Sequence, residues 1–457
     1  MPASPPASIF KAYDVRGLYG EEMDSGTAYL IGRAFARVLA RLRDKEVADL
    51  RVGLGRDMRL TAPEMSSAVR RGLTDEGAEV IDAGQVATEM HYFLVGSREL
   101  DGGAMVTASH NPKAYTGVKL IREGALALSG DAGIQDVRAE IEAGLPDPPG
   151  GGSAEEVDIW SDFREHILGF VDSATIGPLR ILADGGDGMA GPMVGPILER
   201  LNLDLATTHW QPDGDFPDRG PNPLLEENRR FIVEQVQERG VDLAIAWDGD
   251  ADRCFFIDAD GSFCDGDFVC ALLARAALVK EPGATVLYDP RSSRAVPDTV
   301  RAGGGRSDLS RVGHAFFKIR MRETGAVFGG EVSGHYYFRD FYCADSGTIP
   351  ALLMLELISR EDRTLGELMS EFRSRYFISG EINSEVADQE GKMEEIAERY
   401  SDGEIGRLDG ISVDYPDWHF NVRPSNTEPL LRLNLESLDS RDHMTEKRDE
   451  VLALIRS

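Results

Sequence analysis

The feature that most constrains this sequence is an apolar run that ends in three regularly spaced carboxylates. Residues 243–246 (Leu-Ala-Ile-Ala) are typical of a buried strand, and Asp248, Asp250 and Asp252 follow at every second position. Two like charges about 4 Å apart repel by about 4 kcal/mol at an effective dielectric near 20. A hard divalent cation such as Mg²⁺ or Ca²⁺ removes that repulsion. The pattern predicts either a cation site at the end of a strand or a solvated acidic turn.

A calcium-binding EF-hand loop is the sharper alternative, and the sequence excludes it. Such a loop needs Gly at its sixth position and Glu at its twelfth. When Asp248 is counted as the first position, those places hold Arg253 and Ala259.

The order of apolar patterns predicts an α/β protein. Strand-like runs alternate with helical patterns, which favours mainly parallel sheets. The second helix is expected to begin at Thr61 as N-cap, with Pro63 in its first turn. The expected strands cover residues 52–55, 79–82, 104–107, 180–183, 285–288 and 326–329, and the expected helices cover about 30–42, 192–201, 225–239, 266–280 and 348–359.

The chain divides by composition into successive units. Residues 146–153 (Pro-Asp-Pro-Pro-Gly-Gly-Gly-Ser) form the clearest linker. Three α/β units of similar size are expected before about residue 370. The remaining residues differ, with short strand-like pieces at 418–422 and 430–435 and a final helix at about 440–456.

Charge and cysteine content narrow the classes of function. With 49 basic and 79 acidic residues the formal charge is −30, which argues against nucleic acid or an anionic membrane as a partner. The four cysteines have neither zinc-site nor disulfide-framework spacing. The N-terminus lacks a signal pattern, and no apolar run reaches about 18 residues. A soluble, cytoplasmic protein is expected.

The segment 107–112 (Thr-Ala-Ser-His-Asn-Pro) follows a predicted strand. Its Ser109 is a candidate nucleophile or a turn hydroxyl. A dyad of Ser109 with His110 is not expected, because adjacent side chains of an extended backbone point opposite ways. Lys119 is a candidate proton carrier or phosphate ligand, or a surface lysine.

Residues 186–191 (Gly-Asp-Gly-Met-Ala-Gly) match the pattern G-x-G-x-x-G after a strand. Asp204 lies 18 residues beyond Gly186, as in a dinucleotide-binding fingerprint. A structural strand-to-helix turn is the alternative. The nucleoside-triphosphate pattern G-x-x-x-x-G-K-[ST] is absent from the sequence.

Two further loops carry candidate binding groups. Residues 329–335 present Glu331, Ser333 and His335, which suit hydrogen bonds to vicinal sugar hydroxyls, or form a plain tight turn. Residues 423–429 (Arg-Pro-Ser-Asn-Thr-Glu-Pro) resemble an anion cradle, because arginine is a forked donor and neutral donors surround it. A plain loop is again the alternative.

Taken together, the order and spacing of these motifs carry a resemblance that none of them carries alone. The chain resembles the α-D-phosphohexomutase superfamily, and within it most closely the bacterial phosphomannomutase/phosphoglucomutase group. The motifs that carry the resemblance are residues 13–17 (Tyr-Asp-Val-Arg-Gly), 107–112, 248–253, 330–335 and 423–429, with secondary matches at 55–57 and 313–314.

The resemblance implies a fold of four domains around a central cleft. Three are related α/β units with mixed sheets, and the fourth is a smaller α+β domain. The expected boundaries are 1–150 with the serine loop, 154–258 with the metal loop, 259–370 with the sugar loop, and 371–457 with the phosphate loop.

The resemblance also implies an intramolecular phosphotransferase that interconverts hexose 1-phosphate and hexose 6-phosphate. A phosphoserine at Ser109 would donate to the sugar, and a hexose 1,6-bisphosphate would serve as intermediate and activator. Mannose and glucose phosphates are the expected substrates. A phosphoglucosamine mutase and a non-catalytic phosphosugar-binding protein of the same fold are the alternatives, and a monomer or a homodimer is expected.

Specific roles follow from the resemblance. The metal, Mg²⁺, would be held by Ser109, Asp248, Asp250 and Asp252. The other catalytic residues would be Arg16, Arg253, and Lys119 or His314 as general acid and base, with His314 favoured because the unperturbed pKa of histidine lies near neutrality. The substrate-binding residues would be Tyr13, Arg291, Glu331, Ser333, His335, Arg423, Ser425, Asn426, Thr427 and Arg432.

The sequence departs from the family pattern at four places. Gly186-Asp187-Gly188 stands where Gly-Asn-Gly is frequent, and Arg291 stands where lysine is frequent. Thr116 replaces a common asparagine, and Asp345-Ser346-Gly347 replaces a common Asp-Asp-Gly. These departures bear on the subfamily more than on the class of reaction.

Overall fold

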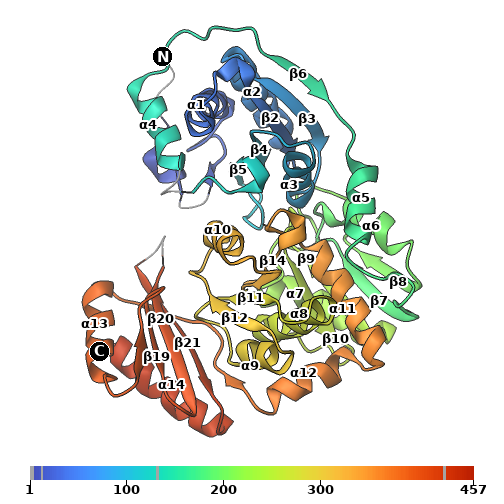
Figure 1. The fold of residues 1–457 in the computed structure, drawn as a ribbon, viewed down its shortest axis with the longest axis vertical. Helices are drawn as coiled ribbons and strands as arrows, with labels where there is room; N and C mark the ends of the chain where they lie inside the picture. The colour runs from blue at the N-terminus through green and yellow to red at the C-terminus, as the bar shows by residue number, and fades with distance from the viewer. Residues whose placement is uncertain (1–4, 12–13, 130–132, 426–428) are drawn as a thin grey trace. The chain divides into compact units, whose positions relative to one another are not determined.

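The computed structural model describes residues 5–11, 14–129, 133–425 and 429–457 (Figure 1). The chain forms two compact units. Unit 1 comprises residues 1–263 and 335–364, and unit 2 comprises residues 264–334 and 365–457.

The first sheet of unit 1 is mixed. β2 pairs in parallel with β3 and β4, and β3 pairs in parallel with β6, whereas β5 runs antiparallel to both β4 and β1. The strand order is β1-β5-β4-β2-β3-β6. The bounds are β1 Val15–Leu18, β2 Arg51–Arg56, β3 Glu79–Gln85, β4 Gly102–Val106, β5 Tyr115–Arg122 and β6 Ser153–Glu156.

Four α-helices accompany this sheet in the described residues: α1 Ser25–Arg43, α2 Ala62–Asp75, α3 Thr88–Ser97 and α4 Gln135–Ala143. α1 and α2 cross closely because Gly32 and Gly72 face the partner backbone, where an added Cβ would collide with Val69 O and Tyr29 O. Thr61 occupies the predicted N-cap position of α2, but the expected side-chain capping hydrogen bond is absent. Thr61 precedes the helix but makes no side-chain cap, and its hydroxyl instead donates to Thr116 Oγ1 at 3.3 Å.

The second sheet of unit 1 has the order β10-β9-β7-β8. β7 pairs in parallel with β8 and β9, and β9 and β10 form an antiparallel hairpin whose turn carries the three aspartates. The bounds are β7 Leu179–Asp184, β8 Leu203–Thr208, β9 Leu243–Trp247 and β10 Cys254–Asp258, with α5 Trp160–Leu168, α6 Ala190–Leu198 and α7 Glu226–Arg239.

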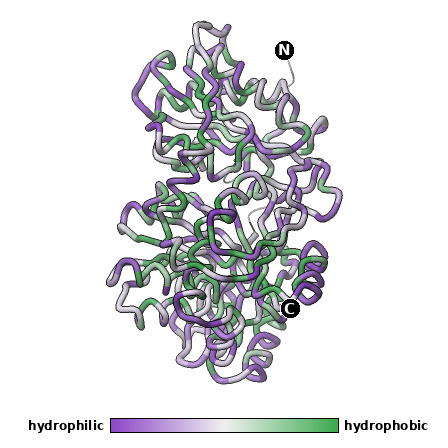
Figure 2. The backbone as a smooth tube through the Cα atoms, turned by 90° about the vertical axis from the view of Figure 1, so that its right-hand side faces the viewer, coloured by the Kyte–Doolittle hydropathy of each residue, from purple (hydrophilic) through white to green (hydrophobic). Residues whose placement is uncertain are grey.

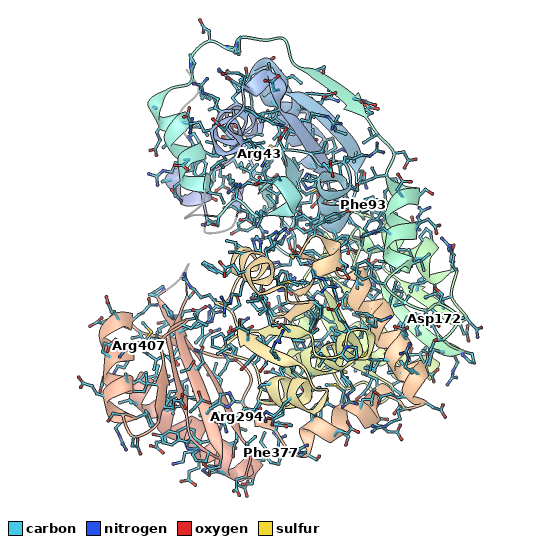
Figure 3. All side chains as sticks on the ribbon, viewed as in Figure 1. Arg43, Phe93, Asp172, Arg294, Phe377 and Arg407 are labelled. Atoms are coloured by element: carbon cyan, nitrogen blue, oxygen red, sulfur yellow. The ribbon has the colours of Figure 1, made fainter. Side chains whose placement is uncertain are left out.

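The later segment of unit 1 supplies a short antiparallel pair and a buried helix. They are β14 Tyr336–Phe338, β15 Ala344–Asp345 and α11 Thr348–Glu361. Aromatic contacts also hold unit 1 together: Phe93 of α3, labelled in Figure 3, lies 5.7 Å from Phe163 and 5.3 Å from His166 between ring centroids, both on α5.

Unit 2 begins with a parallel arrangement in which β11 lies between β12 and β13. Its strands are β11 Thr285–Tyr288, β12 Arg306–Leu309 and β13 Phe328–Gly330, and its helices are α8 Gly266–Lys280, α9 Ala295–Ala302, α10 His314–Thr324 and α12 Leu365–Arg373.

The rest of unit 2 is an antiparallel sheet with two helices. β21 pairs with β16, β17 and β20, and the sheet continues through β19 to β18. Arg294, labelled in Figure 3, ties this sheet to α9 by donating to the carbonyl oxygens of Tyr415 (2.6 Å) and Pro416 (3.1 Å). The bounds are β16 Phe377–Ile378, β17 Ile382–Glu385, β18 Glu404–Gly406, β19 Ile411–Asp414, β20 Trp418–Pro424 and β21 Leu430–Ser437, with α13 Gln389–Arg399 and α14 Arg441–Ile455.

Hydrophobic and hydrophilic stretches alternate along the backbone (Figure 2). Among the described residues, no helix combines the length and the apolar character that a bilayer crossing requires. The four cysteines are all buried.

Candidate active site

The serine loop follows β4, and its backbone is held in an uncommon conformation. Ser109 has φ of +46° and is 3% exposed. Its N–H donates to Thr107 Oγ1 (2.8 Å), and Arg59 donates to its carbonyl oxygen (2.8 Å). A left-handed conformation costs a non-glycine residue about 1–2 kcal/mol. These contacts hold the candidate nucleophile in place against that cost.

Ser109 and His110 do contact each other, so the expectation that they would not is wrong. Ser109 Oγ lies 3.1 Å from His110 Nδ1. The expectation assumed extended backbone, and the positive φ of Ser109 turns the two side chains toward each other. Burial, with the charges of Arg253 and Arg16, holds the pKa of His110 well below its usual value, so the ring is neutral.

The serine hydroxyl meets the aspartate turn within unit 1. Ser109 Oγ donates to Asp248 Oδ2 at 3.2 Å. Arg253 Nε donates to the same oxygen at 2.9 Å. Burial raises the pKa of Asp248 to about 7, against the opposing charge of Arg253 and with the repulsion of the neighbouring aspartates.

The three aspartates fit a hard cation. Asp248, Asp250 and Asp252 are fully buried, and one oxygen from each lies within 4.8 Å of the others. Asp250 Oδ1 and Asp252 Oδ1 accept no hydrogen bond from the part of the chain that the structure describes. Buried carboxylate oxygens without donors are costly unless a cation or a donor satisfies them. The donor set therefore suits a divalent metal that prefers oxygen ligands.

Lys119 on β5 lies directly on this cluster. Its Nζ donates to Asp250 Oδ2 (3.1 Å) and to Asp252 Oδ2. Burial alone lowers the pKa of Lys119, but the charges of Asp250 and Asp252 outweigh it and raise that pKa well above its usual value. Lys119 is therefore an ammonium group that offsets part of the aspartate repulsion.

Arg16 on β1 reaches the serine loop. Its Nη1 donates to Asn111 Oδ1 (2.6 Å) and to Ala108 O (3.1 Å), and its Nη2 pairs with Asp14 at 2.6 Å. The structure thus brings Arg16, Ser109, Lys119, Arg253 and the three aspartates together in one unit. Tyr13 lies outside the described residues.

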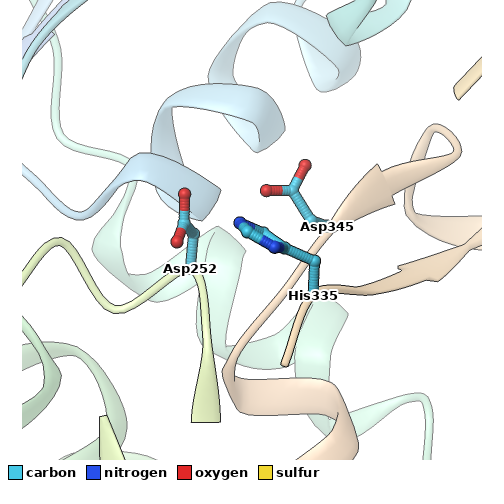
Figure 4. A group of neighbouring side chains, drawn as sticks. All are labelled: Asp252, His335 and Asp345. Carbon is cyan, nitrogen blue, oxygen red and sulfur yellow. The ribbon is translucent and has the colours of Figure 1, made fainter. Parts of the chain in front are cut away.

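His335 also lies beside the aspartate turn (Figure 4). One ligand atom each from Asp252, His335 and Asp345 falls within 4.8 Å of the others. Burial lowers the pKa of His335 to about 4 in spite of the adjacent Asp252, so its imidazole is neutral near pH 7.

The predicted sugar-binding loop lies in unit 2 at the end of β13. Glu331 is 2% exposed, and it accepts a hydrogen bond from the N–H of Gly313 at 2.8 Å, next to His314 at the start of α10. Arg291 lies 3.6 Å from Glu331 and makes two hydrogen bonds to Asp289, at 2.9 and 2.8 Å. Ser333 follows in the same loop.

Three arginines of unit 2 gather around one glutamate that sequence reasoning missed. Glu381 lies 3.1 Å from Arg432, 3.7 Å from Arg423 and 3.9 Å from Arg291. Arg432 also donates to Ser425 Oγ at 3.3 Å. Burial and the charge of Arg291 lower the pKa of Arg423. Three forked donors thus converge on one carboxylate, and the predicted residues Asn426 and Thr427 lie outside the described residues.

Four family models match the chain in succession. They are phosphoglucomutase/phosphomannomutase α/β/α domain I over residues 7–145, domain II over 161–261, domain III over 265–376 and the C-terminal domain over 381–454. The chain belongs to the phosphoglucomutase/phosphomannomutase family. This confirms the resemblance, the fold class of three α/β domains with mixed sheets plus a C-terminal domain, and the class of enzyme.

Relatives in this family match along nearly the whole chain. A phosphomannomutase of Escherichia coli (strain K12) is 42% identical over 440 residues, which cover 94% of this chain and 95% of that protein. A protein of Xanthomonas campestris pv. campestris (strain B100) named phosphohexose mutases is 41% identical over 451 residues, covering 98% and 99%.

Solved structures of the family share the fold. A phosphoglucomutase/phosphomannomutase family protein from Burkholderia thailandensis superposes with a TM-score of 0.89 at 31% identity, covering 98% of this chain and 97% of that one. The open form of a Paramecium phosphoglucomutase, parafusin, superposes with a TM-score of 0.79 at 15% identity, covering 99% and 95%. The second likeness bears on the fold alone.

Several contacts to the predicted family site come from residues that sequence reasoning did not single out. Thr88, at the start of α3, donates to Asp250 Oδ2 (2.6 Å), and its N–H donates to Asp250 O (3.2 Å). Arg59 holds the serine loop, and Glu381 holds the arginines. The match of residues 55–57 was the one signal near Arg59. The domain boundaries and the roles of individual residues stay predictions.

Proposed function

We propose that this chain is a Mg²⁺-dependent phosphohexomutase that interconverts the 1- and 6-phosphates of mannose, glucose or both, with Ser109 as phosphoryl carrier. The observation that carries the proposal is the 3.2 Å contact of Ser109 Oγ with Asp248, a carboxylate that Arg253 also binds. The names of the relatives, phosphomannomutase and phosphohexose mutases, favour mannose and glucose over glucosamine. Four cysteines in 457 residues, without the spacing of a disulfide framework, fit a cytoplasmic location.

Phosphoryl transfer depends mainly on positioning and on charge stabilisation. Asp248, Asp250 and Asp252 would hold the metal, which neutralises charge on the transferred group when bound. Arg253 already lies on Asp248, and Arg16 lies on the serine loop, so their guanidinium groups suit the oxygens of a phosphate on Ser109. The fixed backbone of Ser109 reduces the reorganisation needed for transfer in either direction.

The attacking sugar hydroxyl must lose a proton, and the same kind of group must return a proton when the bisphosphate gives back its other phosphate. Lys119 and His314 remain the candidates. Lys119 lies on two of the aspartates, whose charges raise its pKa well above the usual value, so in this arrangement it is protonated but gives up its proton only weakly. His314 neighbours Gly313, whose N–H binds Glu331, so it accompanies the proposed sugar-binding loop.

The second phosphate requires its own site. Glu331 and Ser333 would bind sugar hydroxyls, with His335 as a further substrate contact. Arg291, Arg423 and Arg432, which share Glu381, would bind the phosphate that is not reacting, with Ser425, Asn426 and Thr427 as neutral donors. One such site must accept both orientations of the 1,6-bisphosphate, because each phosphate in turn must face Ser109. The oligomeric state, monomer or homodimer, remains a prediction.

A coupled assay of mannose 1-phosphate, glucose 1-phosphate and glucosamine 1-phosphate tests the proposal, with Mg²⁺ and the matching 1,6-bisphosphate supplied. We expect turnover of mannose or glucose phosphate, or of both. Activity with the glucosamine substrate alone would replace the proposed substrate class. Absence of turnover, together with an intact mass that shows no phosphoryl group on Ser109, would favour a binding protein instead.

A further inference from the structure

The glycine-rich motif at residues 186–191 packs against the turn that carries the aspartates. We call residues 247–253 the metal loop. An added Cβ on Gly188 would lie 2.5 Å from Gly249 O, and the N–H of Met189 donates to that same oxygen at 3.0 Å. An added Cβ on Gly191 would collide with Trp210 O. These glycines permit close backbone contact, which is a packing role.

Arg219 fills the space that the motif leaves open. It is 6% exposed, and its three guanidinium nitrogens all donate: Nε to Asp184 Oδ1 (2.7 Å), Nη2 to Trp247 O (2.8 Å) and Nη1 to Gly220 O (2.9 Å). Gly186 has φ of +56°, and an added Cβ there would collide with the guanidinium group. Arg219 therefore binds the metal loop through the carbonyl that directly precedes Asp248.

The opposite side of Asp248 is held as well, because the N–H of Gly249 donates to Pro221 O at 3.1 Å. Asp248 thus lies between two backbone positions that the segment 219–221 anchors. Asp184 is fixed in turn by Thr208 Oγ1 (2.9 Å) and His209 Nδ1 (2.6 Å). Burial raises the pKa of Asp184, but Arg219 and His209 outweigh it and lower that pKa, so Asp184 is the ionised partner of Arg219.

We propose that Arg219, held by Asp184, is a positioning residue that presets the metal loop for a divalent cation. The inference rests on the proposed function for the presence of a metal site, and it assigns Arg219 no contact with substrate. The three aspartates repel one another, so a loop without this anchor spreads before the cation binds, and its affinity falls. Groups that orient metal ligands typically contribute about 10–100-fold in affinity.

Direct binding of Mn²⁺ to the full chain, followed by electron paramagnetic resonance, provides a readout that does not need turnover. We expect Arg219→Gln to weaken Mn²⁺ binding about 10–100-fold. Arg219→Lys keeps the positive charge, so its affinity for Mn²⁺ should lie between those of Arg219→Gln and the wild type. Asp184→Asn should also lower the affinity for Mn²⁺. Arg200→Gln is the matched control, because Arg200 makes an exposed pair with Glu165 in the same unit and its loss leaves binding unchanged. The concentration of Mg²⁺ needed for half-maximal turnover rises in Arg219→Gln, while kcat at saturating Mg²⁺ stays close to that of the wild type.

Folded Arg219→Gln protein that binds Mn²⁺ within about twofold of the wild type overturns the inference. If Arg219→Gln does not fold, Arg219→Lys and Asp184→Asn decide, and wild-type affinity in both overturns it equally. A wild type that binds Mn²⁺ but does not turn over hexose phosphates contradicts the proposed function alone. A wild type that binds no Mn²⁺ contradicts the metal site and this inference together.

Discussion

Glu89 is a buried carboxyl group whose replacement gives a pH-dependent prediction. It is fully buried on α3 and accepts hydrogen bonds from the hydroxyls of Ser346 and Thr348. Burial raises the pKa of Glu89 to about 8, against the lowering effect of those hydrogen bonds. The native protein therefore keeps this proton over a pH range in which the unfolded chain has lost it.

The sign follows from that difference. Because the unfolded chain binds fewer protons between pH 4.5 and 8, rising pH favours unfolding across this window. Each pH unit in this window lowers the free energy of unfolding by about 1.36 kcal/mol, so the total loss between pH 5 and pH 8.5 is about 4 kcal/mol. Glu89→Gln imitates the protonated acid and has no proton to lose. Its stability advantage over the wild type is expected to be small at pH 5 and to grow with pH until it levels off above pH 8.

Thermal unfolding of metal-free wild type and Glu89→Gln at several pH values measures this difference. At an unfolding entropy of about 2.1 cal/mol/K per residue, about 4 kcal/mol corresponds to a relative shift in Tm on the order of 6–7 °C for unit 1. Glu165→Gln is the matched control, because Glu165 is exposed and pairs with the exposed Arg200. Parallel Tm profiles for the wild type and Glu89→Gln would refute the reasoning.

The hydrogen bond of Ser346 to Glu89 bears on the metal loop. Ser346 Oγ accepts the N–H groups of Thr348 and Ile349 at 3.1 and 3.0 Å and so caps α11. The carbonyl oxygen of the intervening Gly347 accepts a hydrogen bond from Trp247 Nε1 at 2.9 Å. An added Cβ on Gly347 would lie 2.5 Å from Ala251 O. The turn that Glu89 binds is therefore packed against the metal loop, which explains why a serine suits position 346 in this chain: a second carboxyl group there would face Glu89.

Three further predictions concern the proposed reaction. Ser109→Ala should lower turnover by about 10⁴-fold or more while substrate binding by calorimetry changes little, and wild-type turnover would refute the phosphoserine role. Asp250→Asn should raise the Mg²⁺ requirement about 10–100-fold, and an unchanged Mg²⁺ titration would contradict a ligand there. Glu381→Gln removes a carboxylate that Arg291, Arg423 and Arg432 share, so inorganic phosphate should bind several-fold more tightly, and weaker binding would show that Glu381 orients these arginines instead.

Sequence reasoning succeeded where the pattern is local. β9 and β11 are short apolar runs, so their positions could be predicted closely, whereas α1 was expected at about 30–42 and begins five residues earlier, at Ser25 after a capping Asp24. α3 was missed because eight of its ten residues are buried, which leaves no polar face to reveal a helical period. The contact of Thr88 with Asp250 was missed with it.

The candidate site was predictable in its chemistry and only partly in its geometry. Ser109 and the aspartates could be proposed as site residues because they occur in short motifs that follow strands, whereas Lys119 lies within β5. The left-handed backbone at Ser109, which turns it toward His110, leaves no mark in the sequence. Glu89 lies 257 residues from Ser346, so a pairing of this kind depends on topology that no local pattern contains.

The net charge of the chain and the charges near the proposed phosphate site lead to different expectations for anion binding. A formal charge of −30 predicts an unfavourable field for anions, yet the proposed substrates carry phosphate. Screening limits that field to a Debye length of about 8 Å at physiological ionic strength, so distant carboxylates contribute little at a given site. Arg291, Arg423 and Arg432 all lie within 3.9 Å of Glu381, and Arg291 also binds Asp289, so short-range pairs set the charge that a phosphate meets at these forked donors. These short contacts decide whether an anion binds there, because they are shorter than the Debye length and salt screens them little.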